Sequence, residues 1–263
     1  MYSHRVVLTC LLCLFSAPLF AQPQIGGGIC NSATLNGTYS LTISGRDPGD
    51  AITVTNVLEG IGTVTFDGLS KVTFNLTANT NQQAGQALTW SGTYSMPTNC
   101  VGTINITTGD TATFVLQAYN TGTNYLITGQ DGSYSLSGNG GKPPASACSA
   151  GTLNGTYELS ASGVALSSTT LNGGANLAGL MVFNGTGGLT TNRVLLIGRS
   201  SSTDTTSGTY SVTAGCTGIA TITDPSGNSY GLAFSISSTS AANFSMNASN
   251  SKLIFIGTGR IIP

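Results

Sequence analysis

Histidine is almost absent from this chain. The only one among 263 residues is His4, which lies in a segment with the pattern of an export signal. A mature chain without imidazole can form neither a Ser-His-Asp nor a Cys-His nucleophile arrangement, and a zinc site would lack its usual nitrogen ligand. The common hydrolytic and metal-dependent enzyme classes are therefore not expected.

Charge is scarce as well. Charged residues make up 6% of the chain, against roughly 25% in an ordinary soluble domain. The basic residues form no cluster, so nucleic acid is not expected as a partner. Hydrophobic residues nevertheless amount to 40% and alternate with polar ones, which predicts a folded chain rather than a disordered one.

The N-terminus predicts export. Arg5 supplies a positive charge, Val6 to Phe20 form an apolar stretch, and Ala21 is a small residue at the expected cleavage point. This pattern predicts a signal peptide over 1–21, followed by an N-terminal extension over 22–29. The stretch is too short to span a membrane, and no second one follows. We expect an exported protein, located in the medium, at the cell surface or in the periplasm, without a transmembrane segment in the mature chain.

The rest of the chain consists of two tandem copies of one domain. Leu35-Asn-Gly-Thr-Tyr39 returns as Leu153-Asn-Gly-Thr-Tyr157, and Ser91-Gly-Thr-Tyr-Ser95 returns as Ser207-Gly-Thr-Tyr-Ser211. The interval is the size of a domain and far too long for a solenoid repeat. We expect repeat 1 over 30–138, a linker over 139–147 and repeat 2 over 148–263.

Four cysteines remain once the signal peptide is removed. Cys30 and Cys100 in repeat 1 match Cys148 and Cys216 in repeat 2. An even number of cysteines at matched positions in an exported chain predicts disulfides. Of the three possible connectivities, the duplication favours one bridge inside each repeat. A zinc site is the alternative, which the absence of histidine and of close cysteine pairs disfavours.

Hydrophobic alternation predicts an all-β fold. Tyr39, Leu41 and Ile43 fall on one face of a strand, as in a half-buried sheet. The same pattern predicts eight strands in each repeat, at about 37–45, 58–66, 71–79, 86–96, 101–107, 111–120, 123–129 and 132–138, and at about 155–163, 176–183, 189–199, 206–213, 217–223, 229–238, 242–248 and 251–259.

Tight turns connect these strands. Asp67-Gly68 and Asn184-Gly185 lie at matched positions between strands and supply the positive backbone angles of a hairpin turn. Eight antiparallel strands with a single apolar face bury that face by closing into an up-and-down barrel. We therefore expect two tandem eight-stranded barrels, with β-sandwiches as the alternative.

These motifs also resemble a known family. Cys30 followed by Leu35-Asn-Gly-Thr-Tyr39, with Gly92-Thr-Tyr94 in a later strand, is similar to calycin-type barrels of the avidin and lipocalin kind. The pattern also resembles exported bacterial tandem-repeat proteins of unestablished activity. The resemblance implies a barrel fold. It does not imply biotin binding, because avidins use several tryptophans for biotin and this chain has only Trp90.

The acidic residues are explained as turn formers. Most of them stand beside Gly or Pro, and no carboxylate pair recurs in both repeats. Asp47-Pro-Gly-Asp50 offers two oxygens to calcium, but it lacks the ligand spacing of a dedicated loop and has no counterpart in repeat 2. We expect neither a metal, nor a cofactor, nor an enzymatic activity.

The barrel interior is where we expect function. Eight-stranded barrels are either filled by their side chains or just wide enough for one small ligand. The filled core is the favoured alternative, and Gly92 is expected to leave space for the Trp90 indole. If a pocket exists, its candidate ligand-binding residues are the following: Trp90, Tyr94, Tyr39, Tyr157 and Tyr210. Other side chains expected to point inward in repeat 2 include Leu159, Phe183, Val194, Ile222, Phe234, Phe244 and Phe255.

Two functions remain open at this stage. The first is an exported, non-enzymatic binding protein that holds a small apolar molecule in a barrel interior or mouth, or contacts a cell-surface or matrix component. The second is a structural or adhesive surface module without a ligand pocket. A cavity that opens beside Trp90 or Tyr94 would favour the first, and closed cores with a flat face of Thr, Ser and Asn side chains would favour the second.

Overall fold

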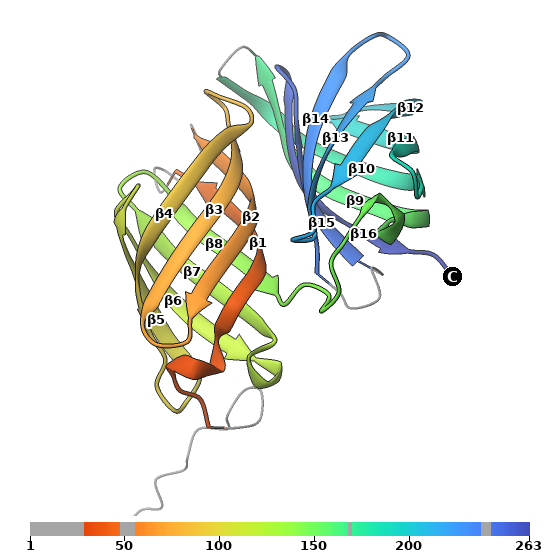
Figure 1. The fold of residues 1–263 in the computed structure, drawn as a ribbon. Coiled ribbons are helices and arrows are strands. Elements are labelled where there is room, and N and C mark those ends of the chain that lie inside the picture. The colour runs from red at the N-terminus through yellow and green to blue at the C-terminus, as the bar shows by residue number, and fades with distance from the viewer. Residues whose placement is uncertain (1–28, 48–55, 168–169, 238–242) are drawn as a thin grey trace, which may run out of the picture.

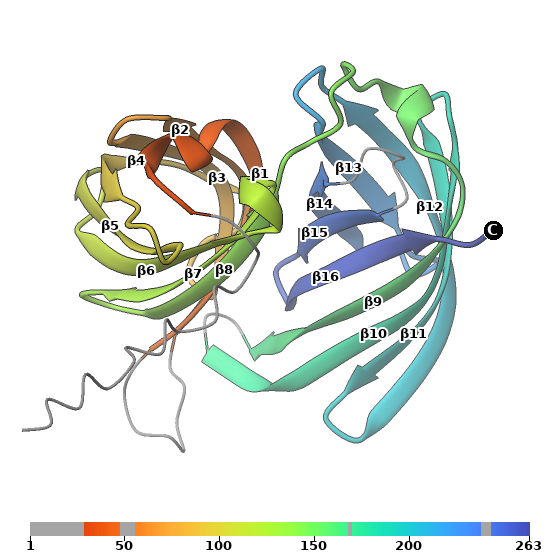
Figure 2. The same cartoon turned by 90° about the horizontal axis from the view of Figure 1, so that it is seen from below.

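Two β-barrels lie side by side, joined by a short connection (Figures 1 and 2). The structure is a computed structural model, which describes residues 29–47, 56–167, 170–237 and 243–263. The predicted signal peptide over 1–21 lies outside the described residues, as does the extension up to residue 28. Both barrels are closed, and each has eight antiparallel strands.

Each strand pairs with its neighbours in sequence, and the last strand of each barrel returns to the first. This closure confirms the barrel prediction and shows that the sandwich alternative is wrong. The first barrel is built from β1 (Asn36–Arg46), β2 (Val57–Asp67), β3 (Lys71–Thr80), β4 (Gln86–Ser95), β5 (Val101–Thr108), β6 (Ala112–Tyr119), β7 (Asn124–Asp131) and β8 (Ser135–Gly141). The second is built from β9 (Asn154–Ser167), β10 (Thr170–Asn184), β11 (Gly188–Ile197), β12 (Ser200–Val212), β13 (Thr217–Thr223), β14 (Ser229–Ile236), β15 (Asn243–Ser249) and β16 (Leu253–Ile261).

The strand ends depart from the prediction at a few places. β8 continues to Gly141 and so includes the first residues of the predicted linker. β9 and β10 are longer than expected, because residues 164–167 at the end of β9 pair with residues at the start of β10, between 170 and 174. Three short 3-10 helices complete the fold: η1 (Ser32–Thr34), η2 (Asn120–Gly122) and η3 (Ala150–Thr152).

The hairpin turns form as their residues predict. Gly68 and Gly185 have φ of 77° and 74°, values that residues with a side chain rarely adopt. The Asp67 carboxylate accepts backbone hydrogen bonds from Leu69, Ser70 and Lys71. These bonds hold the pKa of Asp67 below its ordinary value. The carboxylate is therefore used to shape the turn.

Both predicted disulfides are present, Cys30–Cys100 and Cys148–Cys216. They close loops of 70 and 68 residues, and each is expected to stabilise its barrel by roughly 4 kcal/mol through the entropy of the unfolded chain. Cys100 and Cys216 both adopt a φ of 63°. The duplication thus extends to an unusual backbone conformation at the second cysteine of each repeat.

The first barrel is filled by its own side chains. Trp90 is 2% exposed and lies 6.2 Å from Phe74, centroid to centroid. The reason given above for its burial is wrong, however. The space next to Gly92 is occupied by the β5 backbone, since a Cβ atom there would lie 1.9 Å from Asn105 O. Glycine at this position therefore allows two strands to approach, and the indole packs elsewhere in the core.

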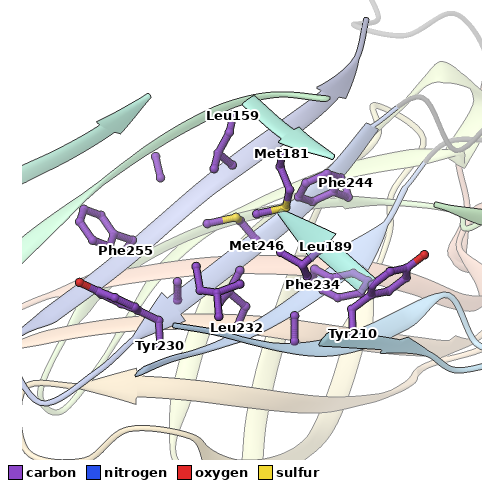
Figure 3. Close-up of a cluster of buried hydrophobic side chains, with 14 of the residues drawn as sticks. Leu159, Met181, Leu189, Tyr210, Tyr230, Leu232, Phe234, Phe244, Met246 and Phe255 are labelled. Atoms are coloured by element: carbon purple, nitrogen blue, oxygen red, sulfur yellow. The ribbon is translucent and has the colours of Figure 1, made fainter. Parts of the chain in front are cut away.

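The second barrel has a separate core (Figure 3). Tyr157, Phe183, Phe234 and Phe244 are buried there, as expected. Val194 is a correction: it is 47% exposed and points away from the core. In the run Val194-Leu-Leu-Ile197 every residue is apolar, so alternation cannot show which two face inward. Pairing with β10 and β12 places Leu195 inside instead.

The outer faces of the barrels pack against each other. Ile61 on β2 and Ile254 on β16 point away from their own cores and are 2% and 1% exposed. Asn247 on β15 donates its amide to two carbonyls of the first barrel, Glu59 O at 3.2 Å and Thr77 O at 2.9 Å. The two repeats are therefore joined by a contact surface as well as by the linker.

Glu59 lies buried next to this contact. Its side chain is 1% exposed, and the Arg46 guanidinium lies 2.5 Å from Oε1, although without hydrogen-bond geometry at that oxygen. Ser44 donates to Oε2 at 2.6 Å. Burial raises the pKa of Glu59, and the Arg46 charge and the hydrogen bonds offset this only in part.

Removing the Trp90 ring tests the filled first core. Trp90→Ala should lower the free energy of unfolding by about 3–5 kcal/mol, because a large buried ring leaves a cavity. Chemical denaturation measures the loss, with Leu126→Ala as the control, since Leu126 is 44% exposed on β7. Equal losses in both variants, or the long-wavelength emission of a solvated indole in the native protein, would contradict the burial of Trp90.

The Glu59 carboxyl should make stability depend on pH. Its pKa in the folded protein lies above the ordinary value of 4.5, so the folded state holds this proton more tightly than the unfolded state. The stabilisation is complete below about pH 4.5 and is lost as the pH rises through the raised pKa. In denaturation at several pH values, the stability of wild type relative to Glu59→Gln should fall from pH 4.5 toward pH 7. Glu158→Gln, on an exposed position of β9, is the control; a flat difference for Glu59→Gln would show that the carboxyl titrates normally.

Candidate ligand site

One end of each barrel is covered by the 3-10 helix that precedes its first strand, η1 or η3, together with the disulfide. We call this helix and disulfide the plug. In the first barrel, the Tyr94 hydroxyl donates to Ser32 O at 2.7 Å and to Leu35 O at 3.0 Å. In the second, the Tyr210 hydroxyl donates to Ala150 O and Leu153 O, both at 2.8 Å. The repeated tyrosine therefore fastens the helical plug to the barrel. Burial, with the nearby Asp67 charge, raises the pKa of Tyr94 to about 12.

The other predicted ligand residues are buried as well. Tyr39 is completely buried and donates to Gly122 O at 2.7 Å. Tyr157 is completely buried, with Phe183 and Phe244 each 5.4 Å away, centroid to centroid. Burial raises the pKa of both tyrosines. The structure thus places Trp90 and all four tyrosines within the cores, and none of them lines the open end described next.

The two interiors differ at two cross-strand pairs. In the first barrel Phe74 pairs with Trp90, and Leu76 pairs with Leu88. At the matched positions of the second barrel, Thr191 pairs with Thr206 and Arg193 pairs with Asp204. A third difference is on β14, where Tyr230 occupies the position of Ala112. At the same height in the same fold, the first barrel therefore has apolar side chains and the second has polar ones.

The polar pairs are closely bonded. The Arg193 guanidinium forms two parallel bonds with the Asp204 carboxylate, from Nε at 2.7 Å and from Nη2 at 3.0 Å. Its Cζ lies 4.5 Å from the centre of the Tyr230 ring, a cation–π distance. The Thr191 and Thr206 hydroxyls are bonded to each other at 2.6 Å. The fold holds these groups in one arrangement.

Arg193 and Asp204 differ in their access to solvent. The Arg193 side chain is 2% exposed and that of Asp204 is 21% exposed. Burial by itself lowers the pKa of Arg193, but the hydrogen bond and charge of Asp204, together with Tyr230, raise it above its ordinary value. The cation is therefore permanent and hidden, and the carboxylate is the member of the pair that a small molecule can reach.

A groove of about 570 Å³ opens above this pair. It lies at the end opposite the plug, which we call the mouth of the second barrel. β12 starts at Ser200 but pairs with β13 only from Ser207 onward, so the β11–β12 hairpin projects at this end (Figure 2). Tyr230 lies toward the mouth and Tyr210 toward the plug, at opposite sides of the core in Figure 3. The groove is lined by Leu195, Ile197, Ser202, Asp204, Asp224, Asn228, Tyr230, Asn250, Lys252 and Leu253, among others.

This volume falls in the range of small-molecule sites, which is about 300–1,000 Å³. Leu195 and Leu253 form apolar walls, and Asp204 lies at the base. Asp224 is engaged in its own turn, where its carboxylate accepts bonds from the backbone of Ser226 and Asn228. Asp204 is the lining carboxylate that no turn explains.

Residues of the types that ligate metals are dispersed in the described part of the chain. Within residues 29–47, 56–167, 170–237 and 243–263, no three His, Cys, Asp or Glu side chains are grouped to hold an ion. Of the calcium candidate Asp47-Pro-Gly-Asp50, only Asp47 is described, and it accepts a hydrogen bond from Asn56. Asp50 lies outside the described residues.

Sequence reasoning missed the polar interior. In the sequence, Arg193 is one of the dispersed basic residues, and Asp204 is one of the acidic residues, which as a group were interpreted as turn formers. The signal was available in the duplication: aligning the repeats on Phe66-Asp-Gly and Phe183-Asn-Gly places Arg193 opposite Leu76. A charge at a position that is apolar in the sister repeat is the feature that would have identified the site.

Comparisons with known proteins assign no family. No family model matches the chain, and no curated protein matches it. One solved structure that resembles it is a protein of unknown function from the DUF3598 family of Nostoc punctiforme. That protein is 10% identical, with 87% of this chain and 97% of that chain covered, at a TM-score of 0.28. A TM-score this low supports no inference about this chain. Among the described residues, no helix has the length and hydrophobicity required to cross a membrane.

Replacing the ion pair by leucines tests the geometry. Arg193→Leu alone should lower the free energy of unfolding by about 3 kcal/mol, because it leaves a largely buried Asp204 without its partner. The double variant Arg193→Leu with Asp204→Leu copies the Leu76–Leu88 pair of the first barrel. Its free energy of unfolding should equal that of wild type within about 1 kcal/mol, or exceed it. Denaturation of the single and double variants measures both. A double variant less stable than the single one would show that the pair is not closed as described.

Proposed function

We propose that this chain is an exported, non-enzymatic binding protein that holds a small ligand in the mouth of its second barrel. The observation that carries the proposal is a difference between the repeats: where the first barrel has the apolar pair of Leu76, which is buried, and Leu88, which is partly buried, the second has the Arg193–Asp204 ion pair beside an open groove. Burying an ion pair is commonly less favourable than burying leucines of similar volume. The sister barrel shows that this fold accepts the leucines, so stability does not account for the charges.

Export rests on two observations. The N-terminal pattern of Arg5, an apolar stretch and Ala21 is that of a signal peptide. Both cysteine pairs form disulfides, which are typical of oxidising compartments outside the cytoplasm. The two features agree with each other and support the same location.

The mixed lining favours a ligand with polar as well as apolar parts. Leu195, Leu253 and Ile197 offer apolar contact, whereas Asp204 and Ser202 offer hydrogen bonds. A wholly apolar molecule would leave the Asp204 carboxylate covered and without the water that solvates it, which is costly. The ligand is therefore amphiphilic rather than purely apolar. In this arrangement the first barrel, with its filled core, has a structural role.

One observation favours the alternative of a surface module. Apolar side chains on the outer faces of β10 and β11 are exposed to solvent, where soluble proteins usually place polar residues on a half-buried strand. The group consists of Leu180, Val182, Val194 and Leu196, which are 41%, 40%, 47% and 37% exposed. Such a group is suited to contact with another macromolecule.

Blocking the mouth tests the binding function. The probe is N-phenyl-1-naphthylamine, an uncharged molecule whose aromatic rings fit apolar walls and whose fluorescence rises on binding. Ser202→Trp places an indole in the mouth and should weaken binding at least tenfold. Ser201→Trp is the matched control, because Ser201 is the next residue of β12, is also exposed, and faces the other side of the strand. Equal binding by wild type and Ser202→Trp, or none by wild type, would leave the surface-module alternative.

A further inference from the structure

We propose that the ligand in the mouth of the second barrel is an uncharged polyhydroxyl compound, a sugar or a glycoside, that donates hydroxyl hydrogen bonds to Asp204. This inference rests on the proposed binding function and adds the chemistry of the ligand. It depends on which atoms of the ion pair reach the groove, on the charge of the lining and on the apolar walls.

Asp204 has acceptor capacity left over. A carboxylate offers about four acceptor positions on its two oxygens, and Arg193 uses one on each oxygen. The remaining ones belong to a side chain that is 21% exposed and lines the groove. Because Arg193 holds the carboxylate in place from behind, the free acceptor positions have fixed directions. A pair of neighbouring hydroxyl groups is the donor set that matches two fixed acceptors on one carboxylate.

An anionic ligand is disfavoured. The Arg193 guanidinium is 2% exposed and its bonds are directed at Asp204, so an anion entering the mouth meets the carboxylate first. The accessible cation in the lining is Lys252, and Asp224 in the same lining offsets it. Like charges at short range raise the free energy of the bound state.

A cationic ligand gains little electrostatic attraction from this site. Arg193 neutralises Asp204 through two bonds of 2.7 and 3.0 Å, so the pair has no net charge to attract an amine. The rest of the charged lining is also balanced, with one acid and one base. A donor that brings no charge of its own satisfies the carboxylate without a further desolvation cost for an ion.

The remaining lining suits a sugar ring. Ser202, Asn228 and Asn250 contribute hydroxyl and amide groups, and Leu195 and Leu253 contribute apolar walls on the same groove. A pyranose presents hydroxyl groups at its edge and C–H groups on its faces, so it matches both kinds of surface at once. A groove of about 570 Å³ has room for one or two such rings.

The test compares three probes that share a phenyl ring and differ in charge, in isothermal titration of the full mature chain. They are phenyl β-D-glucoside, which is neutral, phenyl phosphate, an anion, and benzylamine, a cation at neutral pH. Free glucose is added to separate recognition of the sugar from a requirement for an attached apolar group. We expect the glucoside to bind at least tenfold more tightly than either charged probe. Tighter binding of phosphate or amine would overturn the assignment of the ligand class.

Two variants connect binding to Asp204. Arg193→Leu with Asp204→Leu should weaken the glucoside by about tenfold or more, the loss expected for a hydrogen bond to a charged acceptor. N-phenyl-1-naphthylamine, which is uncharged and contacts the apolar walls, should lose much less affinity in the same variant, which shows that the mouth is still formed. Glucoside binding unchanged in the double variant would overturn the role of Asp204.

The failures of the two proposals are distinguishable. If N-phenyl-1-naphthylamine binds and Ser202→Trp blocks it, but the glucoside does not bind, then the mouth is a binding site and the polyhydroxyl ligand is wrong. If neither probe binds wild type, both proposals are wrong. If glucose and the glucoside bind equally, the site recognises the sugar alone; tighter binding of the glucoside indicates a conjugate.

Discussion

The closure of each sheet on itself is the constraint on which the rest of the molecule depends. Because β8 pairs with β1 and β16 with β9, neither sheet has a free edge, and every strand must send alternate side chains into a narrow interior. Eight strands give an interior that is just filled by side chains. A few inward-facing pairs therefore determine which side chains fill the interior of a barrel. A change in one pair alters the packing and polarity of the interior at that level.

The duplication supplies an internal control for this interior. The plug, the disulfide, the anchoring tyrosine and the Asp-Gly or Asn-Gly turn recur in both repeats with nearly the same geometry. Those shared features maintain the fold. The exchange of Phe74–Trp90 and Leu76–Leu88 for Thr191–Thr206 and Arg193–Asp204 stands out against them, because nothing in barrel closure requires it. Comparison within one chain thus separates residues that build the barrel from residues that set its contents.

Much of the fold could be predicted from the sequence. Period-two alternation, paired cysteines and hairpin turns are local signals, and they led to sixteen strands, two disulfides and closed barrels. Which side chains of a strand face the core could not be predicted where every residue is apolar, as in Val194 to Ile197. The contact between the barrels was not predicted, because Asn247 and Glu59 are polar residues whose burial depends on a partner 188 residues away.

The candidate site was harder to predict for a related reason. Aromatic residues were the candidates because large side chains either fill or line a small barrel. In this structure they fill it: Trp90 and Tyr39 are 2% and 0% exposed. In the proposed site, recognition depends instead on a polar pair inside the barrel, Arg193 and Asp204. A tolerated polar group shows in the sequence only as one charged residue among many, unless the sister repeat shows what is normally buried there.

In the proposed site, the Arg193–Asp204 pair would link the stability of the second barrel with ligand binding. Arg193 is buried and held against Tyr230, so its loss of hydration is offset by Asp204 and by the ring rather than by water. Asp204 in turn is fixed in one orientation, with part of its surface toward the groove. An acceptor fixed before the ligand arrives loses little conformational entropy on binding. Burying the charges lowers the stability of the second barrel, but it also fixes the proposed acceptor in place before a ligand arrives. The first barrel has leucines at the matched positions and packs against the second one.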